Sequence, residues 1–135
     1  MTYLWIALGG ALGSVGRYAL NGVVSEKLGA GATFPLGTLA VNVAGSFVIG
    51  VLGALTMPEG RMGSEGRAFV TQFMMVGICG GFTTFSSFSL QTLSLMRDRE
   101  WLYAGGNVLL SVALCLLATW LGFVLVVAIT STKGH

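Results

Sequence analysis

The sequence predicts an all-α membrane protein with four transmembrane helices, the third of them broken mid-membrane. Only seven residues are Lys or Arg and five are Asp or Glu, while 54% of the chain is apolar. An ordinary soluble domain carries about 25% charged residues. The charges are also clustered, since four long ranges contain none: 1–16, 28–58, 68–96 and 101–132. A chain of this length has room for a single domain, residues 1–135.

The uncharged ranges locate the helices. The last three are each longer than the roughly 20 residues that cross a bilayer, whereas the first reaches that length only by including Arg17. No basic segment precedes the first apolar stretch and no clear cleavage site follows it, so we expect a membrane span there rather than a signal peptide. The expected spans cover about residues 3–24, 36–57, 68–96 and 102–130.

The third span contains a glycine- and hydroxyl-rich segment, GICGGFTTFSSFS, at residues 77–89. Its glycines are expected to supply conformational freedom, and its hydroxyl groups to cap the second half of the helix. Unpaired backbone at membrane depth is tolerated only where protein or a wet cavity surrounds it. Its carbonyl groups can coordinate a small cation, and a helix N-terminus attracts anions. The segment therefore predicts a permeation site. The glycines expected to supply conformational freedom are Gly77, Gly80 and Gly81. The residues expected to cap the second half of the helix are Thr83, Thr84 and Ser86.

Three phenylalanines of this span, Phe82, Phe85 and Phe88, recur at every third residue and would share one helical face. Packing is the commoner role of such a pattern. The positive edge of an aromatic ring nevertheless attracts a small anion without holding it tightly, which suits a pore, where an ion must enter and also leave. The hydroxyl groups of Thr84 and Ser87 would provide hydrogen-bond donors beside the rings.

Two further sets of polar residues lie in predicted spans. The amide of Asn42 has two donor hydrogens, which can bind an anion or join two helices. The fourth span carries a polar stripe at positions i, i+4 and i+8, formed by Asn107, Ser111 and Cys115. The stripe is either a track for an ion or a contact between helices, and the sequence leaves both interpretations open.

Arg17 is the only formally charged residue within a predicted span. An ionisable group inside a membrane indicates function by default, and a cation attracts anions. Arg17 would then line a vestibule. Alternatively, its long side chain reaches the headgroup region and has no role in transport.

Other functional classes fit the sequence less well. A proton-coupled small multidrug transporter needs an intramembrane carboxylate, and no Asp or Glu lies in a predicted span. A helical scaffold would explain the glycine-rich faces but does not require a broken helix. No catalytic triad, Cys/His cluster or phosphate-binding loop is present, and the net charge of +2 is too small for nucleic-acid binding. We therefore expect a protein that is not an enzyme. Cys79 and Cys115 are expected to be free thiols inside spans.

The basic residues outside the spans are almost balanced between the two sides of the membrane. Lys and Arg in short loops normally set the orientation, so near-equality predicts insertion both ways and an antiparallel, dual-topology homodimer. The alternative is a single fixed orientation, determined by a feature that the count of basic residues does not include. The side with both termini carries Arg61, Arg67 and Lys133, and the other carries Lys27, Arg97 and Arg99, with Arg17 if it reaches the interface.

Three segments, taken together and in this order, resemble the Fluc/CrcB family of bacterial fluoride channels over essentially the whole chain. They are GSVGRY at residues 13–18, GTLAVN at 37–42 and the segment 77–89. The resemblance implies a passive, fluoride-selective channel that exports cytoplasmic fluoride and so reduces its toxicity. It also implies an antiparallel homodimer in the cell membrane, which is the inner membrane in a Gram-negative source.

The resemblance further implies roles for individual residues. Arg17 would lie in a vestibule, and a structural sodium ion at the dimer centre would be held by the backbone carbonyls of Gly80 and Thr83. The implied partners are fluoride, a second copy of the chain and membrane lipid. The implied anion pore comprises Asn42, Thr84, Phe85, Ser87, Phe88, Asn107, Ser111 and Cys115.

Overall fold

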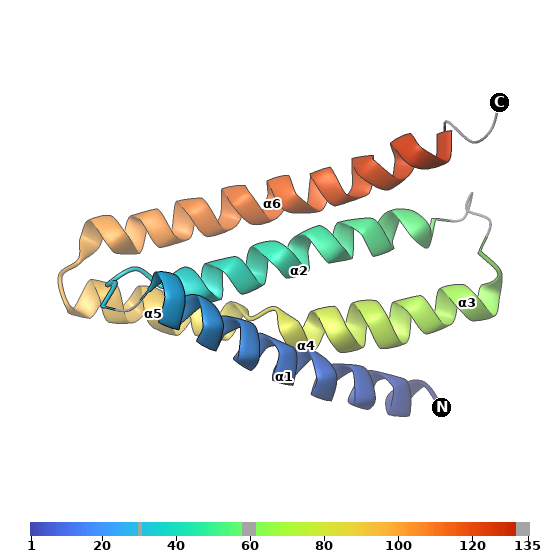
Figure 1. Ribbon diagram of the computed structural model, residues 1–135, viewed down its shortest axis with the longest axis horizontal. Helices are drawn as coiled ribbons and strands as arrows, with labels where there is room; N and C mark the ends of the chain where they lie inside the picture. Colours follow the sequence, from blue (N-terminus) through green and yellow to red (C-terminus); the bar gives the residue numbers. More distant parts are fainter. Residues whose placement is uncertain (30, 58–61, 132–135) are drawn as a thin grey trace.

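The computed structural model describes residues 1–29, 31–57 and 62–131, and these residues form helices joined by short connections, without a strand. Helix α1 spans Thr2–Leu28, α2 spans Leu36–Leu55 and α6 spans Trp101–Ser131. In chain order, one interrupted helical segment follows α2 and precedes α6, and it lies on the opposite side of α2 from α6 in Figure 1. It consists of α3 (Ser64–Phe69), the π-helix η1 (Val70–Cys79), α4 (Gly80–Phe82) and α5 (Phe85–Arg97).

Within the described residues, three helices are long and apolar enough to cross a membrane: Leu36–Leu55, Ser64–Arg97 and Trp101–Ser131. Helix α1, at 27 residues, has the length but is not among these three. Large apolar side chains cover the outer surface, as illustrated by Leu102, which is 87% exposed, and Leu109, which is 72% exposed. Such a surface suits hydrocarbon, which is as apolar as leucine.

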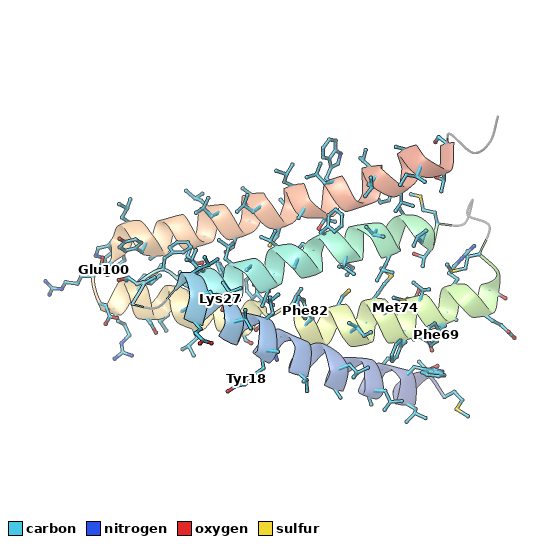
Figure 2. All side chains as sticks on the ribbon, in the orientation of Figure 1. Tyr18, Lys27, Phe69, Met74, Phe82 and Glu100 are labelled. Carbon is cyan, nitrogen blue, oxygen red and sulfur yellow. The ribbon has the colours of Figure 1, made fainter. Side chains whose placement is uncertain are left out.

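The chain connections define two ends of the bundle. The N-terminus, the start of α3 and the end of α6 lie at one end, and the ends of α1 and α5 lie at the other (Figure 1). Figure 2 shows Lys27 and Glu100 close to the second end and Phe69 toward the first. Of the basic residues counted above, Arg67 belongs to the first end and Lys27, Arg97 and Arg99 to the second, while Arg61 and Lys133 lie outside the described residues.

The predicted break in the third helix is confirmed, and it falls at Thr83 and Thr84. Their backbones are extended, with φ −78° and ψ 155° at Thr83 and φ −148° and ψ 111° at Thr84. The predicted cause of the break is wrong. Gly80 is helical, with φ −64° and ψ −37°, and the only described glycine with a positive φ is Gly31.

The glycines of the third segment instead allow α1 to approach very closely. A Cβ atom added to Gly77 would lie 2.9 Å from the Cα of Gly9, and one added to Gly81 would lie 3.0 Å from the Cα of Gly10. Backbone therefore packs directly against backbone along this interface, as small residues permit between membrane helices. This contact fixes α1 against η1 and α4, immediately before the break.

Candidate functional site

A groove of about 390 Å³ lies at the break, between α2, α5 and α6. No Asp or Glu is among the described residues that line it. Thr83, whose carbonyl was expected to bind a cation, also lines the groove. The tertiary structure thus brings together six residues of the predicted anion pore, which come from three separate helices and the break: Asn42, Thr84, Phe85, Phe88, Ser111 and Cys115.

The side chain of Asn42 holds the break in place. Its Oδ1 accepts a hydrogen bond of 2.8 Å from the Thr84 N–H, and its Nδ2 donates one of 3.1 Å to the Thr84 carbonyl. In an uninterrupted α-helix, the Thr84 N–H would donate to the carbonyl of Gly80. The amide therefore replaces the helical partner of Thr84, and it deprives the Gly80 carbonyl of its usual donor.

Hydroxyl groups satisfy the two helix ends that meet at the break. Thr84 is the N-cap of α5, and its Oγ1 accepts from the Ser87 N–H at 3.1 Å. Thr83 does not cap α5, because its hydroxyl donates backwards to the Cys79 carbonyl at 2.9 Å. The hydroxyls of Ser86 and Ser87 lie 3.2 Å and 3.0 Å from Thr84 Oγ1. Of the three expected caps, the structure therefore confirms Thr84 as the N-cap.

The phenylalanines separate into two environments. Phe85 and Phe88 both line the groove, with ring centroids 5.2 Å apart and an angle of 43° between the rings. Phe85 is 79% exposed, whereas Phe88 is half-buried. Phe82 precedes the break, and its ring lies beside Gly16 and Gly45. The prediction that all three share one face is wrong, because the extended backbone between Phe82 and Phe85 interrupts the helical repeat.

A second cavity, of about 280 Å³, contains the other predicted polar residues near the break. Arg17 and Ser87 line it, and Thr84 borders both this cavity and the groove. Sequence analysis missed Asn21 and Thr38, which also line this cavity. Their only signal was their polarity within otherwise apolar spans. The half-buried position of Arg17 is compatible with a vestibule.

The polar stripe of α6 does not lie entirely in the groove. Ser111 and Cys115 line the groove, but Asn107 is only 2% exposed and is not among the lining residues. Both polar atoms of the Asn107 side chain are used inside the protein. Its Nδ2 donates to Thr92 Oγ1 at 2.9 Å, and its Oδ1 accepts from Ser111 Oγ at 3.4 Å.

Backbone carbonyls are the predicted ligands for a cation near the break. Among the described residues there is no group of three or more His, Cys, Asp or Glu side chains that could hold a metal ion. Gly80 is exposed on the protomer surface, and its carbonyl has lost the Thr84 donor to Asn42. Thr83 is in extended conformation. Unwound carbonyls coordinate sodium in transporters. Thr83 is unwound in this sense, whereas Gly80 is helical and lies just before the break, and the sodium site stays a prediction. Cys79 and Cys115 are free thiols, as expected.

Comparison with known proteins shows the family to which the chain belongs. Residues 4–123 match the family described as "CrcB-like protein, Camphor Resistance (CrcB)". The chain is 61% identical to a protein of Opitutus terrae, covering 98% of this chain and 97% of that protein, and 56% identical to a protein of Methylocella silvestris, covering 99% of each. A protein of Rhodospirillum rubrum is 53% identical, over 92% of this chain and 93% of its own. All three are named "Fluoride-specific ion channel FluC". The chain is therefore a multi-pass cell-membrane protein that belongs to the CrcB family.

Proposed function

We propose that this chain forms a passive, fluoride-selective channel, through which cytoplasmic fluoride leaves the cell and its toxicity is reduced. The groove at the break carries this proposal, because it combines amide, hydroxyl and aromatic groups and its described lining contains no carboxylate. The names of the relatives at 53–61% identity support fluoride as the ion. A channel of this kind is not an enzyme.

Export without an energy source follows from acid–base chemistry. Hydrogen fluoride crosses a membrane as a neutral molecule and ionises in a cytoplasm that is less acidic than the surroundings. The anion is then trapped. A selective pore lets it leave down its electrochemical gradient, so no nucleotide site or proton-exchanging carboxylate is required.

The residues of the groove have distinct roles in this proposal. The ring edges of Phe85 and Phe88 attract the anion weakly, and the thiol of Cys115 donates to it. Ser111 lines the same path but donates its hydroxyl proton to Asn107. A narrow path whose donors replace the hydration shell favours a small anion over a larger one. Arg17 attracts anions into the second cavity, where the Ser87 hydroxyl provides the next donor and Thr84 also lines the wall. Thr84 borders both cavities and completes the path, and Asn42, which lines the groove, holds it in place.

A second copy of the chain completes the pore. The Phe85 ring is 79% exposed on one protomer, although its proposed role requires an enclosed path. The near-balance of basic residues between the two sides of the membrane supports an antiparallel pairing of the two copies. In this arrangement α1 is a membrane span in addition to the other three. Helix α1 is long enough for this at 27 residues, and its backbone contact with η1 places it within the bundle.

A structural sodium ion at the centre of this dimer is also part of the proposal. The carbonyls of Gly80 and Thr83 from each copy would hold it. The loss of the helical donor to Gly80 and the exposure of this residue support the assignment. When bound, the ion would neutralise carbonyl dipoles that would otherwise oppose one another across the interface.

Anion efflux from liposomes tests the function. Purified protein is reconstituted into liposomes loaded with potassium fluoride or potassium chloride, valinomycin carries the counter-ion, and ion-selective electrodes record the release. We expect rapid loss of fluoride and retention of chloride, with protein-free liposomes as the control. Retention of both ions by vesicles that contain folded dimer would contradict the proposal, and equal loss of both would contradict its selectivity.

A further inference from the structure

Helix α5 carries Phe85 and Phe88, yet the extended residues at the break disconnect it from α4. Its position must therefore be set by contacts of its own. Asn42 fixes its first turn through Thr84. Beyond that turn, α5 packs mainly against α6 and only slightly against α2. The orientation of the turn that bears Phe88 consequently depends on what joins α5 to α6.

A buried chain of hydrogen bonds makes this connection. Ser111 Oγ donates to Asn107 Oδ1 at 3.4 Å, and Asn107 Nδ2 donates to Thr92 Oγ1 at 2.9 Å. The Thr92 hydroxyl in turn donates to the carbonyl of Phe88 at 2.8 Å. The chain begins at Ser111 and ends at Phe88, and both of these residues line the groove. The two residues between them, Asn107 and Thr92, do not line it.

The geometry leaves Thr92 little freedom. Its hydroxyl has a single proton, and this proton is committed to Phe88, so the oxygen lone pairs are directed toward Asn107. Thr92 is 7% exposed and Asn107 is 2% exposed. Neither group has ready access to water if its partner is removed. A threonine that bonds to the carbonyl four residues earlier also changes the local bend of its helix. Thr92 therefore acts on the backbone at Phe88 itself.

We propose that Thr92 is a positioning residue for the Phe88 ring, and that Asn107 acts by holding Thr92 and not by contacting the ion. Asn107 would then serve the pore from outside the ion path. A shift of the Phe88 carbonyl tilts the ring edge away from the groove, and such displacements are costly where a site depends on exact geometry. The transport part of this inference rests on the proposed function.

The test compares three single variants in the liposome assay. Thr92→Val keeps the shape of the side chain but removes the hydroxyl, and we expect fluoride efflux to fall by about tenfold or more. Thr92→Ser keeps the hydroxyl and should retain efflux. Thr56→Val is the matched control, because Thr56 Oγ1 donates to the Leu52 carbonyl at 3.0 Å in the same way but lies outside the groove. Efflux by Thr92→Val within about twofold of the unsubstituted protein would overturn the proposal, and so would an equal loss in Thr92→Ser.

A second readout separates positioning from stability. We would place 4-fluorophenylalanine at Phe88 and record its ¹⁹F NMR signal in detergent, with a label at Phe82 as the internal reference. Thr92→Val should shift or broaden the Phe88 signal and leave the Phe82 signal unchanged. In the double variant Thr92→Val/Asn107→Leu no buried amide is left unpaired, so the fold should be retained while the Phe88 signal remains altered. An unaltered Phe88 signal in that variant would contradict the proposal. This measurement requires no transport, so it stands even if the unsubstituted protein fails to conduct fluoride.

Discussion

The side-chain amide of Asn42 pairs with both backbone polar groups of Thr84, accepting from its N–H at 2.8 Å and donating to its carbonyl at 3.1 Å. A residue on α2 thus supplies the hydrogen bonds that a continuous third helix would have made. Thr84 also borders both cavities. The pair therefore stabilises the break and lies where the proposed ion path passes from one cavity to the other.

Replacement of Asn42 with Ala should reduce both stability and transport. Two buried backbone groups of Thr84 would lose their partners, at a cost of about 1–3 kcal/mol each. We expect a lower thermal unfolding temperature in detergent and slower fluoride efflux. Ser46→Ala is the control, because Ser46 lines the same groove without holding the break. Loss of stability with normal efflux in the surviving dimer would assign Asn42 a structural role only.

Replacement of either Phe85 or Phe88 with Ile should abolish most of the fluoride efflux while the dimer survives. Isoleucine keeps an apolar side chain but removes the ring edge that attracts the anion. Liposome efflux measures the transport, and size-exclusion chromatography measures the assembly. Phe47→Ile serves as the control, since Phe47 lines neither cavity. Normal efflux in both groove variants would remove the rings from the mechanism.

Replacement of Gly81 with Ala should destabilise the protein by about 1–3 kcal/mol, because overpacking forces a backbone shift. The added Cβ would lie 3.0 Å from the Cα of Gly10, which cannot move independently of α1. Gly53→Ala is the matched control in α2, where an added Cβ meets nothing within 4 Å. Thermal unfolding in detergent measures the difference, and equal unfolding temperatures for the two variants would contradict the close contact.

Replacement of Arg99 with Gly should stabilise the protein by up to about 1 kcal/mol, because glycine adopts a positive φ without steric cost. Arg99 has a φ of 63° in the turn after α5. Its N–H bonds to the Met96 carbonyl, and that of Glu100 bonds to Leu95 at 2.8 Å, as in a glycine-terminated helix. Arg97→Gly removes the same charge from the last helical turn and should destabilise by about 1 kcal/mol. The two unfolding temperatures should therefore shift in opposite directions.

Local chemistry explains why much of the candidate site was predictable. Threonine is a preferred residue at the N-terminal end of a helix, because its hydroxyl accepts from a free backbone N–H. A cap at Thr84 could therefore be predicted from residue type alone. The π-helical geometry of η1 was not predicted, because apolar periodicity over so few residues does not distinguish the two helix types. The role of Thr92 was also missed. A threonine in an apolar span has no distinguishing signal until its partners on another helix are known.

What the sequence determined by itself was the class of protein, the order of its helices and the position of the break, because these depend on charge-free runs and on residue types within a few positions of one another. Only the tertiary structure decided how the polar residues are used. Asn107 and Ser111 belong to one stripe in the sequence, yet Asn107 is buried against Thr92 and Ser111 lines the groove. The glycines likewise admit α1 at close range and do not break the helix. Such assignments depend on which surface a second helix covers, and that is a property of packing between distant segments of the chain.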